Sequence, residues 1–411
     1  MQTTLPMSST TQYYLDLEEK YSAHNYHPIP VVLDRGEGVF VWDVEGRRYY
    51  DFLSGYSALN HGHSHPKIVQ AFIEQSQKLT LTSRAFHNDW FGEYAKFITE
   101  FFGYNKVLPM NTGVEAVETA IKLCRKWAYE VKGVEKEKAT IVVCEGNFHG
   151  RTTGIISFSS DPDSKNNFGP FMPGFISIPY NDADALEKVL ENKNVCGFLV
   201  EPIQGEAGVR VPNEGYLETT KQLCEQENVL FIADEIQTGL GRTGKMLACD
   251  HENVRPDILI LGKALSGGMM PVSAVLADDE IMLTIKPGEH GSTYGGNPLA
   301  SKIAITALKI LKDEKMTENA LIAGELLRKE LNALHSKHIS IVRGKGLLNA
   351  IAIDHINDEA AWQLCLELKR FGLLAKPTHG DKIRFAPPLI INKEQILECV
   401  SIIKKSLSCL D

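Results

Sequence analysis

The chain has 411 residues, of which 43% are hydrophobic and 23% charged, and its formal net charge is -9. A chain of this length can bury a large core and usually divides into more than one structural unit. Acidic and basic residues alternate along it, which is typical neither of nucleic-acid-binding proteins nor of proteins that bind anionic membranes. Apolar runs end far short of the roughly 20 residues that a membrane span needs, so we expect no membrane segment.

The N-terminal composition favours the cytosol. The first 19 residues contain no Lys or Arg but include Asp16, Glu18 and Glu19. A mitochondrial transit peptide is basic and poor in acidic residues, and a secretory signal needs an apolar stretch. A presequence removed earlier would leave the same appearance, so a mitochondrial location stays open. The eight cysteines are dispersed without a C-x-x-C pair, and we expect reduced, mostly buried thiols.

The middle of the chain alternates short apolar runs with amphipathic helical patterns. Candidate strands cover residues 140–144, 197–201, 229–234, 257–261 and 272–276. Candidate helices among them cover residues 115–127 and 216–226. This alternation predicts an α/β domain with a mostly parallel sheet.

The pattern changes near residue 297. A long helix is indicated by apolar residues at spacings of three and four: Ala320, Ala323, Leu327, Leu331 and Leu334. A second helix, marked by Ala361, Leu364, Cys365 and Leu368, is expected to end before Gly372. We therefore expect a large domain over residues 56–299 and a smaller α+β domain over 300–411, with the N-terminal segment 1–55 packing against the small domain.

Two ionisable side chains each follow an apolar strand, Asp234 after residues 229–233 and Lys263 after 258–261. Ligands of open α/β sheets bind beyond the carboxyl ends of the strands, so we expect both side chains in one crevice. A desolvated lysine can attack a carbonyl to form a Schiff base, and a carboxylate beside a pyridine nitrogen keeps that ring protonated. An arbitrary pair of this kind is more often a surface lysine and a strand-end cap.

Two neighbouring segments strengthen the first interpretation. Gly267 and Gly268 follow Lys263 closely and let the backbone approach a bound ring or phosphate. Residues 111–116 form a loop that enters an amphipathic helix, where free N–H groups suit a phosphate. An ordinary capped helix would give the same pattern, so this second signal is weak alone.

Six motifs occur in order: Thr112-Gly-Val-Glu-Ala, Asn147-Phe-His-Gly-Arg, Glu201-Pro-Ile-Gln-Gly-Glu, Asp234-Glu-Ile-Gln-Thr-Gly, Lys263 and Gly291-Ser-Thr-Tyr-Gly-Gly-Asn-Pro. Together they resemble the class-III, fold-type I aminotransferases, a subgroup that includes ornithine, acetylornithine and 4-aminobutyrate aminotransferases. The resemblance spans nearly the whole chain. It implies pyridoxal 5'-phosphate as the cofactor, a large domain whose mostly parallel sheet is flanked by helices, and a smaller α+β domain.

The resemblance implies a role for each matching residue around the cofactor ring. Lys263 would be the Schiff-base lysine and general base, and Asp234 the partner of the pyridine nitrogen. Gln237 would contact the ring hydroxyl, and Phe148 would stack on the ring.

The resemblance also implies how the cofactor phosphate is held. Gly113 and Val114 would offer backbone N–H groups, and Ser292 and Thr293 would arrive from a second subunit. The last role implies an obligate homodimer.

Residues 23–32 and 53–60 resemble ornithine aminotransferases in particular. By this match Tyr26 would bind the substrate α-amine, Arg151 its α-carboxylate, and Tyr56 would shape the pocket. Glu206 would pair with Arg384 while ornithine binds, because a free guanidinium fork would grip the α-carboxylate and expose the wrong amine.

Without the resemblance each of these side chains has an ordinary interpretation. Glu206 and Arg384 could be a surface ion pair or make no contact at all, and the tyrosines could be core aromatics with satisfied hydroxyls.

The implied reaction transfers the δ-amino group of L-ornithine to 2-oxoglutarate in a ping-pong cycle. Its products are glutamate and glutamate 5-semialdehyde, which cyclises to pyrroline-5-carboxylate. The alternatives are an aminotransferase for N-acetylornithine or another ω-amino acid, an isomerase that needs no 2-oxoglutarate, and a non-catalytic relative. Two departures from the pattern are His149, where many ornithine enzymes carry Trp, and Met270, where an aromatic residue is common.

Two further motifs are set aside. Gly239-Leu-Gly-Arg-Thr-Gly fits a dinucleotide fingerprint, but no clear helical period follows it. His61, His63 and His65 alternate as metal ligands can, but the intervening Gly, Ser and Pro indicate a turn that enters a helix. We expect no metal site.

Overall fold

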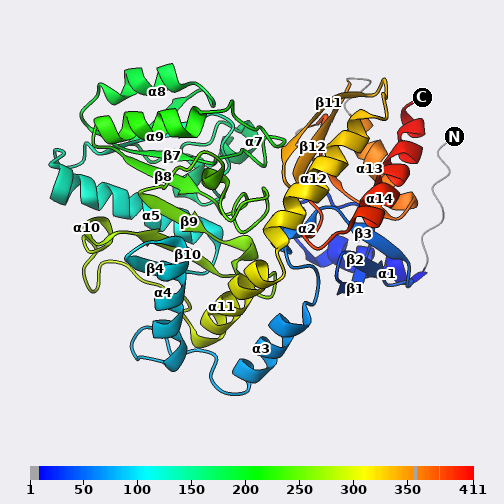
Figure 1. The fold of residues 1–411 in the computed structure, drawn as a ribbon, viewed down its shortest axis with the longest axis horizontal. Coiled ribbons are helices and arrows are strands. Elements are labelled where there is room, and N and C mark those ends of the chain that lie inside the picture. The colour runs from blue at the N-terminus through cyan, green and yellow to red at the C-terminus, as the bar shows by residue number, and fades with distance from the viewer. Residues whose placement is uncertain (1–8, 355–358, 379) are drawn as a thin grey trace.

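The computed structural model describes residues 9–354, 359–378 and 380–411. Figure 1 shows two lobes side by side: the middle of the chain forms the larger one, and the two terminal regions meet in the smaller one. The larger lobe is built on a seven-stranded sheet with the order β4-β10-β9-β8-β7-β5-β6. Its strands are β4 (Lys106–Met110), β5 (Thr140–Cys144), β6 (Phe175–Ile178), β7 (Val195–Val200), β8 (Leu230–Asp234), β9 (Ile258–Leu261) and β10 (Ser273–Ala277).

Only β10 runs antiparallel to its neighbours, so the predicted α/β fold with a mostly parallel sheet is confirmed. The five predicted strands agree with β5, β7, β8, β9 and β10 within two residues at each end, whereas β4 and β6 are additional. Every residue of β7, β8 and β9 is buried, because helices cover both faces of the sheet.

Alternate side chains of β8 show how the two faces are filled. Ile232 packs with helix α5 (Gly113–Trp127), whereas Phe231 and Ala233 pack with α8 (Ala183–Leu190) and α9 (Tyr216–Gln226) on the other face. Figure 1 shows α8 and α9 above the sheet. The other helices of this lobe are α3 (Pro66–Ser76), α4 (Asp89–Phe102), α6 (Thr153–Ile156), α7 (Pro162–Lys165), α10 (Asp279–Met282) and α11 (Pro298–Asp313).

The smaller lobe contains two four-stranded sheets. The first has the order β1-β2-β3-β13, with β1 (Leu33–Glu37), β2 (Phe40–Asp43), β3 (Arg48–Asp51) and β13 (Leu373–Leu374). The second has the order β11-β12-β15-β14, with β11 (Ile339–Lys345), β12 (Leu348–Ile353), β14 (Lys376–Thr378) and β15 (Lys382–Phe385). Because β13 pairs in parallel with β3, the N-terminal strands and the C-terminal region share one sheet.

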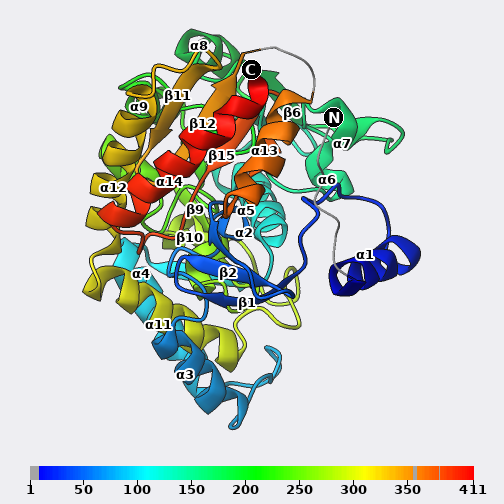
Figure 2. The same cartoon turned by 90° about the vertical axis from the view of Figure 1, so that its right-hand side faces the viewer.

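Helices complete the smaller lobe: α2 (Ser54–Ser57), α12 (Met316–Asn332), α13 (Ala360–Arg370) and α14 (Lys393–Ser406). Helices α12 and α13 are the two predicted from apolar spacing, and α13 ends before Gly372, whose φ is 92°. Figure 2 shows α1 (Ser9–Tyr21) at one side of the molecule, where Tyr13, Tyr14, Leu17 and Tyr21 are exposed.

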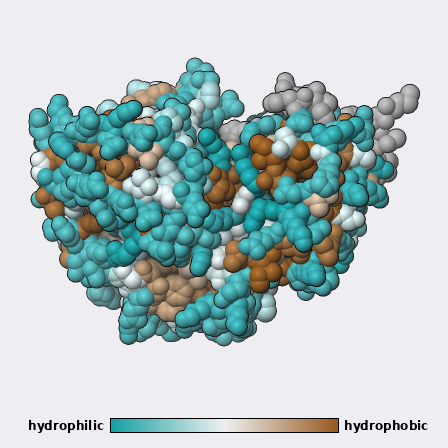
Figure 3. All heavy atoms as spheres, turned by 45° about the horizontal axis from the view of Figure 1, so that its top comes forward, coloured by the Kyte–Doolittle hydropathy of each residue, from teal (hydrophilic) through white to brown (hydrophobic). Residues whose placement is uncertain are grey.

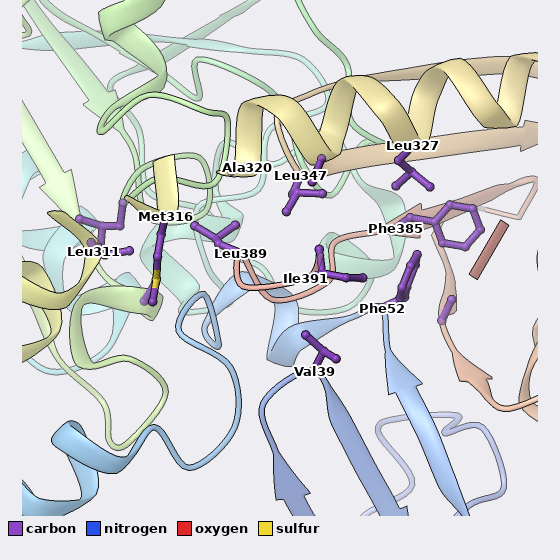
Figure 4. Packing of buried hydrophobic residues seen from close by; sticks show 14 of the residues in the cluster. Val39, Phe52, Leu311, Met316, Ala320, Leu327, Leu347, Phe385, Leu389 and Ile391 are labelled. Atoms are coloured by element: carbon purple, nitrogen blue, oxygen red, sulfur yellow. The ribbon is translucent and has the colours of Figure 1, made fainter. Parts of the chain in front are cut away.

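A hydrophobic cluster continues from one lobe into the other. Figure 4 shows Leu311 and Met316, at the junction of α11 and α12, beside Leu389 of the C-terminal region. Further along the same cluster the rings of Phe52 and Phe385 meet edge to face, with centroids 5.7 Å apart. Burial of such side chains, worth roughly 1.5–3 kcal/mol each, fixes the lobes relative to one another.

The glycine-rich motif set aside above forms turns and not the start of a dinucleotide-binding helix. Its Arg242 is fully buried and donates to Asn60 Oδ1 at 2.6 Å, Leu347 O at 3.0 Å and Pro387 O at 2.6 Å. One guanidinium thus joins three segments that are distant in sequence. His65 directly precedes α3, as expected for a turn that enters a helix.

The remaining general expectations concern cysteines, metals and membranes. Seven cysteines are buried and Cys409 is exposed, and all eight are free thiols. Within the described ranges, no group of three or more His, Cys, Asp or Glu side chains is arranged to hold a metal ion, and no helix is long and apolar enough to cross a membrane. Hydrophilic residues cover most of the face in Figure 3, with apolar residues in separate patches.

Candidate active site

A cavity of about 200 Å3 opens at the carboxyl ends of the central strands. Asp234 is the last residue of β8, Lys263 lies two residues beyond β9, and α5 begins at Gly113. The cavity is lined by Gly113, Val114, Phe148, His149, Gly150, Glu201, Glu206, Asp234, Ile236, Gln237 and Lys263. The structure therefore brings Asp234 and Lys263 into one crevice, together with four other residues that the resemblance placed around the cofactor.

The Asp234 carboxylate is held from both sides. Its Oδ1 accepts the backbone N–H of Ile236 at 3.1 Å, and its Oδ2 lies 2.6 Å from Nδ1 of His149. Burial alone would lower the pKa of His149, but the hydrogen bond and charge of Asp234 outweigh it and raise the pKa. His149 thus donates from Nδ1 and orients the carboxylate.

Sequence reasoning missed this contact, because His149 was weighed only as a departure from the family pattern. The signal that was present is its place beside Phe148 in one of the six motifs.

Lys263 occupies an unusual backbone conformation. It begins a short 3-10 turn, Lys263–Ser266, and its φ of 43° lies in the left-handed region that costs a residue with a side chain roughly 1 kcal/mol. This geometry directs the side chain into the cavity. Burial lowers the pKa of the Lys263 amine, although the charges of Glu206 and Asp234 oppose the shift. A lowered pKa makes the amine available as a neutral nucleophile and base.

Glu201 is a second residue to which the sequence assigned no role of its own. Its Oε1 accepts the backbone N–H of Phe148 at 2.8 Å, which fixes the segment that carries that ring. Burial raises the pKa of Glu201 to about 7, and the neighbouring His149 partly offsets the effect. Its position in the Glu201-Pro-Ile-Gln-Gly-Glu motif was the available signal.

Glu206 and Arg384, from different lobes, meet above the cavity. Arg384 lies on β15 with 1% of its surface exposed, and its Nη1 donates to Glu206 Oε1 at 2.7 Å. Gln237 joins them: its Nε2 donates to the same Glu206 oxygen at 3.0 Å, and its Oε1 accepts from Arg384 Nη1 at 3.3 Å. Burial would raise the pKa of Glu206, but Arg384 and Gln237 outweigh it and lower the pKa, so Glu206 is a carboxylate.

Tyr56 lies beneath this pair, with its ring centroid 5.0 Å from Cζ of Arg384. Burial, and then the charge of Glu206, raises the pKa of Tyr56, so its hydroxyl keeps its proton. Tyr26 is 65% exposed and shares a separate, largely apolar hollow of about 570 Å3 with Tyr56. The structure thus places Tyr56 at the pair and Tyr26 farther out.

The remaining candidate residues are Arg151, Ser292 and Thr293, and none of them lines this cavity. Arg151 is exposed; its Cζ lies 5.5 Å from the Phe148 ring centroid, and its Nη1 donates to Ser164 Oγ at 3.4 Å. Ser292 accepts a hydrogen bond from Asn111 at 2.8 Å, and its neighbour Thr293 is exposed.

The cavity matches the groups of a phosphorylated pyridine aldehyde. The first N–H groups of α5 have no partner within the helix, as a phosphate requires, and Asp234 offers a buried carboxylate to a ring nitrogen. His149 Nε2, also buried, has no hydrogen-bond partner within the described residues. A Cβ on Gly205 would lie 1.5 Å from Gln237 Oε1, so this glycine leaves space for the glutamine. The fold and the cavity define a fold-type I enzyme that depends on pyridoxal phosphate.

Comparison with known proteins gives the family. Residues 21–407 match the family described as Aminotransferase class-III, and the chain belongs to this family. Class-III aminotransferases use pyridoxal phosphate, which is therefore its cofactor. The chain is 63% identical to the protein named "Ornithine aminotransferase, mitochondrial" of Rattus norvegicus, over 97% of this chain and 91% of the rat protein.

Solved structures agree on the fold. The ornithine aminotransferase from Toxoplasma gondii ME49 is 47% identical, with a TM-score of 0.96, over 98% of this chain and 96% of that chain. The acetylornithine aminotransferase from Elizabethkingia anophelis is 60% identical, with a TM-score of 0.89, over 97% of this chain and 99% of that chain. These names point to two different substrates.

Proposed function

We propose that this aminotransferase transfers the δ-amino group of L-ornithine to 2-oxoglutarate and yields glutamate 5-semialdehyde and glutamate. The observation that carries the proposal is the hydrogen-bonded pair of Glu206 and Arg384. A neutralised Arg384 cannot grip the α-carboxylate of ornithine, so the distal amine reaches the reactive centre first. In the second half-reaction a released Arg384 binds the 2-oxo acid.

Pyridoxal phosphate, when bound, supplies an aldehyde that condenses with amines and a ring that accepts electrons. The chain supplies the rest. Lys263 is the nucleophile and the base that moves the proton at the substrate carbon. Asp234, oriented by His149, holds the ring nitrogen protonated, and Phe148 covers one ring face. Gln237 contacts the ring hydroxyl.

At the other end of the ring, Gly113 and Val114 hold the phosphate through their backbone N–H groups. Ser292 and Thr293 complete the phosphate site of a partner subunit in a homodimer. Neither residue lines the cavity of its own chain, which supports this arrangement. The exposed apolar side chains of α1 are a further surface that a second copy can cover.

In the substrate site, Arg151 binds the ornithine α-carboxylate, Tyr26 binds the α-amine, and Tyr56 shapes the pocket. Pairing of β13 with β3 supports a small domain of residues 300–411 joined by residues 1–55, beside a large domain of 56–299. The cytosolic location inferred from the acidic N-terminus stays a prediction, and the rat relative is named mitochondrial.

The second candidate substrate is N-acetylornithine, which the name of the Elizabethkingia structure favours. The deciding experiment mixes the yellow holoenzyme separately with ornithine and with N-acetylornithine, without a keto acid, and follows the loss of visible absorbance. We expect ornithine to bleach the protein and to give the cyclised semialdehyde. Preferential bleaching by N-acetylornithine would show that N-acetylornithine is the substrate. It would also remove the role proposed for Tyr26, because the α-amine of N-acetylornithine is blocked.

A further inference from the structure

A second cavity, of about 430 Å3, adjoins the first. Both are lined by Phe148, His149, Gly150 and Glu206, and we call the larger one the antechamber of the active site. Its outer wall carries three cationic side chains: Arg210, Arg343 and Lys382. None of these residues belongs to the six motifs, and none has a role in the proposed reaction.

The cations gather around one point of the chain. A Cβ on Gly208 would lie 2.3 Å from Cδ of Lys382 and 3.1 Å from Nη2 of Arg343, so both side chains pass this glycine. Arg210 stands on the other side, with its Nη1 3.3 Å from where a Cβ on Gly146 would lie. Burial, and then the positive charge of Arg210, lowers the pKa of Arg343, and the negative charge of Asp381 partly opposes the shift.

The two arginines keep hydrogen-bonding capacity for a ligand. Arg343 donates from Nε to Gly208 O at 2.8 Å, but its buried Nη2 has no partner among the described residues. Within the residues that the structure describes, neither Arg210 nor Arg343 forms an ion pair with an acidic side chain.

The nearby acids differ in what balances their charge. Glu206 pairs with Arg384, whereas Asp161 accepts from Ser164 Oγ at 2.8 Å without an ion-pair partner among the described residues, so its charge offsets part of the positive charge of the cavity. Asp381 pairs with Lys382 and neutralises part of the charge of that lysine. The unpaired positive charge of the antechamber therefore resides mainly on Arg210 and Arg343.

We propose that Arg210 and Arg343, assisted by Lys382, form a capture site for the dianionic 2-oxo acid before it reaches Arg384. This rests on the proposed function, in which a dicarboxylate is the second substrate. A cleft lined by one sign of charge raises the association rate of an oppositely charged ligand by about ten- to a thousandfold at low salt. Ornithine, with a net positive charge, gains nothing from this site. The site thus favours the second half-reaction.

The two half-reactions separate this effect from a structural one. Apoprotein loaded with pyridoxamine 5'-phosphate is mixed with 2-oxoglutarate in a stopped-flow instrument, and protein loaded with pyridoxal 5'-phosphate is mixed with ornithine. For the variant R210Q/R343Q we expect the second-order rate constant for 2-oxoglutarate to fall about tenfold and its dependence on salt to weaken. The rate constant for ornithine should stay within about twofold.

A matched control removes the same charge elsewhere. K136Q/K138Q changes two exposed lysines that do not line the antechamber, and it should leave both rate constants unchanged. R210K keeps the charge and should retain most of the wild-type rate constant. R210Q alone, at an exposed position, should give a smaller fall in the same direction if the double variant folds poorly.

An unreactive dianion gives a readout that is independent of turnover. Calorimetric titration of the pyridoxal-phosphate form with glutarate should show an affinity about tenfold lower in R210Q/R343Q, whereas the monoanion valerate should bind both proteins alike. Equal losses in both half-reactions, or a 2-oxoglutarate rate constant within twofold of wild type, would overturn the capture site. If the wild-type protein loaded with pyridoxamine 5'-phosphate does not react with 2-oxoglutarate, the proposed function itself is wrong.

Discussion

The two ends of the active site are assembled in different ways. At the cofactor end, Asp234 ends β8, Lys263 follows the adjacent strand β9 of the same sheet, and α5 starts beside them. At the substrate end, Glu206 follows β7 of the large lobe, whereas Arg384 lies on β15 of the small lobe. The cofactor end is thus determined by a single sheet, but the substrate end exists only where the two lobes meet.

This difference suits the proposed roles of the two ends: the cofactor end carries the reacting groups, and the substrate end selects the substrate. The sheet keeps Asp234 and Lys263, the groups proposed to act on every amine, at neighbouring strand ends. The Glu206–Arg384 contact can break without disturbing the sheet, since it spans the lobes through one 2.7 Å hydrogen bond and the neighbouring Gln237. In the proposed reaction, the contact that must differ between the two substrates is therefore the contact between the lobes.

The largest expected effect concerns the cofactor end. Lys263→Ala removes the nucleophile and the base, so transfer from ornithine should fall by at least about 10³-fold, the scale of losing a positioned acid–base group. Steady-state turnover measures this loss, and the visible absorbance of lysine-bound cofactor should vanish. Lys245→Ala, a nearby exposed lysine, is the control. Normal turnover in Lys263→Ala would assign the chemistry to another residue.

The fold was largely predictable because its central strands are buried on both faces and appear as continuous apolar runs. The two strands of the large sheet that were not predicted lack that pattern. β4 contains Lys106 and Pro109, and β6 is a four-residue edge strand with an exposed Ser177. Edge strands tolerate proline and polar residues, so their composition does not distinguish them from loops.

The residues of the site were also predictable to different degrees at its two ends. Asp234 and Lys263 follow from strand-end logic, because local sequence places them. The contact of Glu206 with Arg384 depends on how the lobes close, which no local pattern records, and only the family resemblance suggested it. The contact of His149 with Asp234 joins two positions 85 residues apart, and neither source suggested it.

A smaller effect is expected at the outer part of the substrate end. Arg151→Ala removes a charged partner of the ornithine carboxylate, a contact worth roughly 1.5–3 kcal/mol. The KM for ornithine should therefore rise by roughly ten- to a hundredfold, with a smaller change in kcat. Arg35→Ala, at an exposed arginine, is the control in the same kinetic assay. An unchanged KM would mean that another residue holds the carboxylate.

The smallest expected effect tests the contact between the lobes. Glu206→Gln keeps the size and one acceptor oxygen but removes the charge that occupies Arg384. Arg384 then competes for the α-carboxylate of ornithine, and the ratio of α- to δ-transfer should rise about tenfold, since a charged hydrogen bond contributes about 1.5 kcal/mol. Chromatographic separation of the two trapped carbonyl products, the 5-semialdehyde and the 2-oxo acid, measures this ratio. Glu214→Gln, an exposed glutamate, should leave it unchanged.

Glu206→Gln also tests the difference between the two ends of the active site through the second half-reaction. A freed Arg384 binds 2-oxoglutarate without first losing Glu206, so the reaction of the amino form with 2-oxoglutarate should not slow. Unaltered regiochemistry together with a slower second half-reaction would show that Glu206 only supports Arg384. The substrate end would then be as fixed as the cofactor end, and selectivity for the δ-amine would have to come from Tyr26, Tyr56 and Arg151.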